Sequence, residues 1–200
     1  ELKTPLTVIL ANLSILRRQY PDEKWLESTH EEAQQMRCLV EEMLTLARTE
    51  NERHALTLSQ TNLSELLEHT LMTMEPVAFE RGVTLQTHIA QNVTVPCSEL
   101  HVRRLMMILL DNAVKYAEGE KKVTVTLTGK QDPCELRVSN TGAPIPPEIL
   151  PHVFDRFYRG DTTRAGGGFG LGLAIAKETV EALRGSIGVT SSESDGTTFT

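Results

Sequence analysis

Two short segments of this chain combine the groups that bind phosphate. Asp111–Tyr116 places an amide, an ammonium and a phenol at Asn112, Lys115 and Tyr116, on the last turns of a predicted helix. Gly166–Leu173 is rich in glycine and runs into a second predicted helix. An amide oxygen suits a phosphate-bound Mg²⁺, a lysine suits phosphate charge, and backbone N–H groups at a helix start can approach phosphate oxygens. The pair therefore predicts a nucleotide held between the two segments.

Composition narrows the classes of function. The 200 residues suit one or two domains, and 40% apolar with 24% charged residues is ordinary for a soluble globular chain. A net charge of −7 and 4% aromatic residues argue against nucleic-acid binding, which needs basic patches or stacking platforms. The most apolar run, Leu105–Leu110, is far too short to cross a bilayer. We expect both ends of the chain to continue in a longer protein.

The first fifty residues predict a helical hairpin that turns at Tyr20–Pro21. Apolar or small side chains recur every three or four residues on both sides of this turn, at Leu2, Leu6, Ile9, Leu13, Leu16, Leu26, Thr29, Ala33, Met36, Val40, Met43 and Ala47. A seven-residue repeat is typical of supercoiled helix packing. Two helices alone bury little apolar surface, so we expect a second copy to complete a dimeric four-helix bundle. The alternative is a hairpin packed on its own chain.

After a charged connector, Glu50–His54, the hydrophobic period changes. Strands are predicted at 56–58, 83–89, 92–95, 122–128, 135–139, 186–190 and from 197 onward, and helices at 63–79, 98–114 and 169–183. Strands and helices in mixed order favour an α+β fold. We therefore expect a helical hairpin domain at residues 1–53, followed at 57–200 by an α/β sandwich whose mixed sheet is covered by helices and whose last strand is truncated.

The motifs and their order resemble those of the sensor histidine kinases of two-component signalling, whose catalytic domain is shared with gyrase-type ATPases. The matching segments are Glu1–Leu6 (phosphoacceptor helix), Leu109–Tyr116 (Asn box), Asn140–Pro146 (first Gly box), Phe154–Arg159 (Phe box), Gly168–Leu173 (second Gly box) and Gly196–Phe199 (last Gly box). The resemblance implies a protein-histidine kinase core that transfers the γ-phosphate of ATP to a histidine and then to a response-regulator aspartate. It also implies dephosphorylation of that regulator.

The resemblance assigns the first residues a role beside the phosphoacceptor. In the family the acceptor histidine stands immediately before the residue that is Glu1 here, so we expect the chain to begin just after it. Glu1 would take up or stabilise the proton of that imidazole, and Thr4 would position water for dephosphorylation. The histidines that are present lie outside this context, at His30, His54, His69, His88, His101 and His152.

For the nucleotide, the resemblance implies ATP and Mg²⁺ as cofactors. Asn112 would bind Mg²⁺ through its carbonyl oxygen, Lys115 would contact phosphate and Tyr116 would line the pocket. Asn140 would accept a hydrogen bond from the adenine amino group. The other implied binding residues are Gly142, Arg156, Arg159, Gly168, Gly170, Leu171, Gly172 and Thr198.

Three positions depart from the family pattern: Ile108 replaces a second asparagine, Asn140 replaces an aspartate and Pro144 replaces a glycine. They motivate an alternative, a nucleotide-binding regulator or phosphatase-only sensor without kinase activity. A gyrase-like hydrolase is disfavoured because the helical hairpin has no role in it.

The partners implied by the resemblance are a second copy of the chain and a response-regulator receiver domain. The location implied is the cytoplasmic part of a membrane-anchored bacterial sensor, with its membrane spans upstream.

Overall fold

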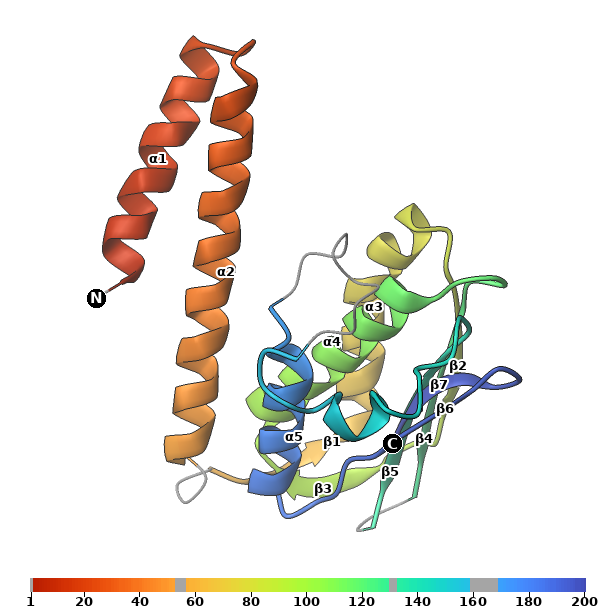
Figure 1. Ribbon diagram of the computed structural model, residues 1–200. Helices are drawn as coiled ribbons and strands as arrows, with labels where there is room; N and C mark the ends of the chain where they lie inside the picture. The colour runs from red at the N-terminus through yellow and green to blue at the C-terminus, as the bar shows by residue number, and fades with distance from the viewer. Residues whose placement is uncertain (1, 53–56, 130–132, 159–168) are drawn as a thin grey trace.

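The structure, a computed structural model, describes residues 2–52, 57–129, 133–158 and 169–200. It begins with two long antiparallel helices, α1 (Lys3–Gln19) and α2 (Lys24–Glu52), followed by an α/β unit that lies beside α2 (Figure 1). The predicted helical hairpin is therefore confirmed.

Only part of the apolar stripe of the hairpin is buried within one chain. Leu6, Leu10 and Leu13 of α1 pack against Leu26 and Ala33 of α2. Other members of the predicted stripe are largely exposed, namely Leu2, Ile9, Leu16, Met36 and Met43. One chain thus leaves a long apolar surface along the hairpin uncovered.

The α/β unit contains one mixed sheet and one small ribbon. Its elements are β1 (Ser59–Asn62), α3 (Leu63–Glu80), β2 (Thr84–Ile89), β3 (Thr94–Cys97), α4 (Glu99–Tyr116), β4 (Lys122–Thr128), β5 (Glu135–Asn140), the 3₁₀ turn η1 (Leu150–His152), α5 (Gly172–Ala182), β6 (Val189–Ser192) and β7 (Gly196–Phe199). The five-stranded sheet has the order β2-β4-β5-β7-β6, with β2 parallel to β4 and the other pairs antiparallel. β1 pairs with β3 in the ribbon. The predicted α+β class and mixed sheet are confirmed.

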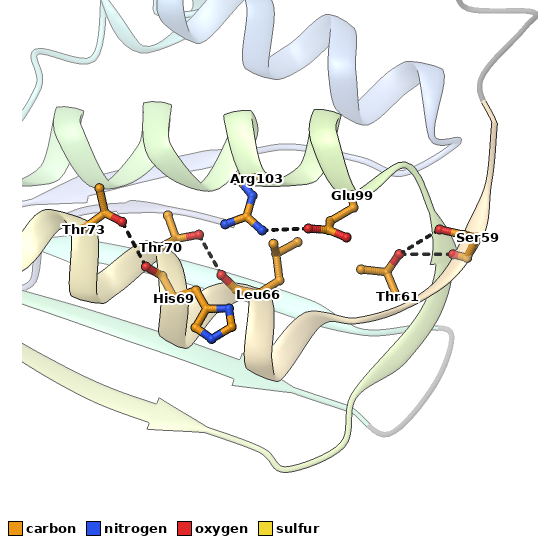
Figure 2. A network of polar contacts seen from close by, with 8 residues as sticks. All are labelled: Ser59, Thr61, Leu66, His69, Thr70, Thr73, Glu99 and Arg103. Carbon is orange, nitrogen blue, oxygen red and sulfur yellow. Dashed lines mark hydrogen bonds and ion pairs between the residues drawn. The ribbon is translucent and has the colours of Figure 1, made fainter.

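Local polar contacts fix the first helix of this unit. The Asn62 side chain accepts hydrogen bonds from the backbone N–H groups of Ser64 and Glu65 and donates to the Glu65 carboxylate. Two of the N–H groups at the start of the helix, which lack a partner within it, are thereby hydrogen-bonded. Farther along α3, the hydroxyl of buried Thr70 donates to the Leu66 carbonyl one turn back, at 2.7 Å (Figure 2). A polar side chain can therefore lie in the interface between α3 and α4 without an unpaired group.

The core lies between the sheet and its helices. All three helices of the unit lie on one side of the five-stranded sheet (Figure 1). Val123, Val125 and Val138 of the sheet are fully buried, as are Leu67 of α3 and Leu110 of α4. Because strand side chains alternate between faces, the residues of β5 and β7 divide into a helix-facing set and an open-face set.

Three predicted elements begin three residues later in the structure, and the strand predicted at 92–95 is Thr94–Cys97. The first strand is Ser59–Asn62, because β3 pairs with this polar segment; of the predicted strand 56–58, residue 56 lies outside the described residues. The last helix begins at Gly172 and not at residue 169, because Gly170 adopts φ +70° and Leu171 is its N-cap. The strand predicted at 186–190 is Val189–Ser192, where pairing with β7 defines it.

Candidate functional site

The C-terminal turns of α4 present the amide and the ammonium together. Asn112, Lys115 and Tyr116 are spaced three and four residues apart, so their side chains lie on one side of the helix. Lys115 Nζ lies 5.0 Å from the centroid of the Tyr116 ring. Asn112 and Lys115 are half-buried, and α4 ends directly after them because Ala117 is extended. A polar edge is thus fixed at the end of this helix.

Asn140, at the end of β5, is tied to the same edge. Its side chain is only 4% exposed, and Nδ2 donates to the backbone oxygens of Tyr116 and Thr141, each at 3.2 Å. Within the described ranges no donor reaches Oδ1 of Asn140. The amide therefore keeps an acceptor while its donor is fixed to α4.

Gly142 allows the loop after β5 to approach the end of α4. Its φ is +150°, and a Cβ placed on it would lie 2.7 Å from the Tyr116 backbone oxygen. Thr141 adds two hydrogen bonds to Glu118: its carbonyl accepts from the Glu118 N–H, and its hydroxyl donates to the Glu118 carbonyl, both at 2.9 Å. The end of the predicted Asn box and the start of the predicted first Gly box thus form one corner of the α/β unit.

β7 brings Thr197 to this corner, whereas Thr198 points away. Asn140 lies directly opposite Thr197 in the ladder between β5 and β7, and Ser139 lies opposite Thr198. Thr197 is 5% exposed and bonds to the Ser191 hydroxyl at 2.8 Å, while Thr198 bonds to Ser139 at 2.8 Å on the open face. Thr198, the predicted binding residue, therefore does not lie beside Asn140, whereas Thr197 does. The register between β5 and β7 is what distinguishes Thr197 from Thr198.

The start of α5 lies against α4 one turn before Asn112. A Cβ placed on Gly172 would lie 3.5 Å from Ile108 Cγ2, and Leu171 is fully buried in the same contact region. Gly170 has φ +70°, and its carbonyl accepts a hydrogen bond from the Phe157 N–H at 3.0 Å. The Asn112 helix and the end of the glycine-rich segment, separated by more than fifty residues in sequence, are thus brought together.

The remaining predicted residues are not gathered at this site. Arg156 forms an ion pair with Glu178 of α5 at 3.2 Å. Thr4 is exposed on α1, and α2 separates α1 from the α/β unit (Figure 1). Glu1, Arg159 and Gly168 lie outside the described residues.

The donor set fits a magnesium ion that is held mainly by a nucleotide. Among the described residues, no group of three or more His, Cys, Asp or Glu side chains could hold a metal ion. Mg²⁺ prefers oxygen ligands, keeps several waters, and is often bound by one or two protein groups together with substrate phosphates. The amide oxygen of Asn112 matches that requirement.

Comparison with known families covers most of the chain. The family model described as "Histidine kinase-, DNA gyrase B-, and HSP90-like ATPase" matches residues 97–200. The model described as "His Kinase A (phospho-acceptor) domain" matches residues 1–52. Within the described ranges, no helix combines the length and apolarity that a bilayer crossing requires.

Individual relatives match nearly the whole chain. Sensor protein DltS of Streptococcus agalactiae is 33% identical over 188 residues, which is 94% of this chain and 48% of that protein. Sensor histidine kinase YkoH of Bacillus subtilis is 34% identical over 207 residues, covering 100% of this chain and 44% of that protein. The crystal structure of full-length ShkA in complex with AMPPNP matches 100% of this chain and 42% of its own, with a TM-score of 0.82 and 25% identity. The chain spans about half the length of the curated relatives it matches.

Proposed function

This chain belongs to the sensor histidine kinases of two-component systems, and from this premise we propose its function. The chain is the kinase core of such a sensor. It binds ATP with Mg²⁺ and transfers the γ-phosphate to a histidine. A response-regulator aspartate then receives the phosphate from that histidine. The observation that carries the proposal is the packing of Gly172 on Ile108, one turn before Asn112. This packing supports a phosphate site between the end of α4 and the start of α5.

Each side chain of the corner has a proposed role. The Asn112 oxygen binds Mg²⁺, which would neutralise part of the phosphate charge, and Lys115 contacts the phosphates. Tyr116 lines the nucleotide pocket. Asn140 accepts from the adenine amino group through Oδ1, with Thr197 beside it in place of Thr198. The remaining proposed contacts are those of Gly142, Gly170, Leu171 and Gly172, together with Arg156, Arg159 and Gly168 from the segment before α5.

The helical hairpin serves as the phosphotransfer and dimerisation domain, residues 1–53, and residues 57–200 form the catalytic domain. The exposed half of the apolar stripe supports pairing with a second copy, because a four-helix bundle would cover it. A receiver domain docks on that bundle, where Glu1 assists phosphotransfer and Thr4 assists dephosphorylation of the regulator. The chain is the cytoplasmic part of a membrane-anchored sensor.

Phosphotransfer has a direct test. A longer chain that includes the residues immediately before Glu1 is expected to acquire acid-labile, alkali-stable phosphate from radiolabelled ATP, because phosphohistidine has that stability. The label should pass to a receiver domain when one is added. A folded dimer that binds ATP·Mg²⁺ without acquiring label contradicts the kinase proposal.

The two threonines of β7 provide a matched pair of variants. Thr197→Val is expected to weaken ATP binding roughly tenfold, because a lost hydrogen bond near the base contributes about 1 kcal/mol or more. Thr198→Val should leave the affinity within about twofold, since its hydroxyl faces Ser139 on the open side of the sheet. Calorimetric titration with ATP measures both variants. Equal weakening by the two substitutions contradicts the assignment of Thr197.

One observation favours a second candidate, a nucleotide-binding sensor without kinase activity. Ile108, at the position of the second family asparagine, packs with Leu46, Leu171 and Ile175 and presents no metal ligand. Binding of ATP that is unaffected by Mg²⁺ would favour this candidate. Binding strengthened by Mg²⁺ favours the kinase.

A further inference from the structure

The helical hairpin docks on the catalytic unit through α2. Leu46 of α2 is buried against Leu171 and Ile175 of α5, and Leu39, Ile108 and Phe169 complete this apolar cluster. Ile108 lies on α4, one turn before Asn112. The docked face of α2 is therefore continuous with the helix that carries the proposed nucleotide site.

One carboxylate lies on the docked face of α2. Glu42 follows Leu39 by three residues and precedes Leu46 by four, so the three side chains lie on the same side of the helix. Its Oε2 atom is buried and has no hydrogen-bond partner among the residues that the structure describes. Buried polar atoms almost always have a partner, and a desolvated carboxylate oxygen without one is unfavourable.

The charged groups that influence the pKa of Glu42 belong to the end of α4. Burial raises the pKa of the Glu42 carboxyl; the nearby Lys115 ammonium opposes this rise, and the Asp111 carboxylate adds to it. Lys115 is also the residue proposed to contact nucleotide phosphate. The same cation therefore offsets the buried carboxylate of the hairpin and is the one proposed to contact the phosphates of the ligand.

We propose that Glu42 couples hairpin docking to nucleotide binding, so that a docked α2 and a bound nucleotide triphosphate disfavour each other. This inference rests on the proposed function, because it requires phosphates beside Lys115. Phosphates would add negative charge near Glu42 and engage the ammonium that offsets it, which makes the docked carboxylate less favourable. Coupling between two equilibria is reciprocal, so docking weakens nucleotide binding to the same extent.

The experiment compares Glu42→Gln with Glu32→Gln in the 200-residue chain. Glutamine keeps the size of the side chain and removes its charge. Glu32 is exposed on the same helix, so its variant controls for the change in net charge. Titration with AMPPNP·Mg²⁺ should give a Kd roughly fivefold lower for Glu42→Gln than for the original chain, at the low end of usual coupling factors. Glu32→Gln should stay within about twofold of the original chain.

Hydrogen exchange of residues 39–46 provides the second measurement. Without nucleotide, Glu42→Gln should protect this segment more than the original chain does, because the buried charge is gone. AMPPNP should speed its exchange in the original chain and in Glu32→Gln, and much less in Glu42→Gln. Equal Kd values and equal exchange responses in all three chains overturn the coupling and leave the proposed function standing. If none of the three chains binds nucleotide, the proposed function itself is overturned, and the inference with it.

Discussion

Replacing Asn112 by alanine is expected to lower the affinity of the chain for ATP·Mg²⁺ roughly 10- to 100-fold, because a polar contact to a charged group contributes about 1.5–3 kcal/mol. With Ile108 packed in an apolar cluster, the turn before Asn112 offers no second amide to take its place. Alanine is the best helix former, so α4 should persist in the variant. Calorimetric titrations with ATP in Mg²⁺ and in EDTA measure the change.

The loss should be confined to the Mg²⁺-dependent part of binding. In EDTA the variant and the original chain should bind ATP with similar affinity, because the proposed contacts of Asn140 and Lys115 do not require the metal. Gln86→Ala is a suitable control, since Gln86 is exposed on the open face of the sheet and also loses an amide. An Asn112→Ala chain that keeps the full strengthening by Mg²⁺ would refute the assignment of the ligand.

Features determined by neighbouring residues could be predicted from the sequence. The Asn62 side chain caps α3 and bonds to Glu65 three residues later, and the start of α3 was predicted at Leu63. The hairpin was predictable because the apolar repeat of each helix is local. The same repeat could not show which of its members pack within one chain, since that division depends on how α1 and α2 pack against each other.

Features determined by distant pairing could not be predicted in this way. Leu56–Leu58 is the more apolar candidate for the first strand, but β3 pairs with the polar residues 59–62. Thr197 and Thr198 are equivalent by residue type, and only the register with Asn140 decides which one faces the helices. Glu42 looks like any charged residue of a surface helix until α2 is seen docked on α5. In each case a contact across the fold, and not the residue itself, determines the role.

Replacing Gly196 by alanine is expected to destabilise the α/β unit by roughly 3 kcal/mol, because a left-handed alanine costs about 1–2 kcal/mol and overpacking a further 1–3 kcal/mol. Gly196 has φ +69°, and a Cβ placed on it would lie 2.1 Å from the backbone oxygen of Asn140. The sheet would have to shift where β7 pairs with the end of β5. Urea unfolding followed by circular dichroism measures the free energy of unfolding.

Gly119→Ala separates the two contributions to this loss. Gly119 has a similar φ of +64°, and a Cβ placed on it would meet nothing within 4 Å. Its variant should therefore lose only about 1–2 kcal/mol, the conformational part. Gly196 lies directly against the backbone of Asn140. Gly196→Ala should therefore also weaken ATP binding at temperatures where the chain is still folded, whereas Gly119→Ala should not. If the two variants lose equal stability, a Cβ at residue 196 does not clash with Asn140, and this prediction is wrong.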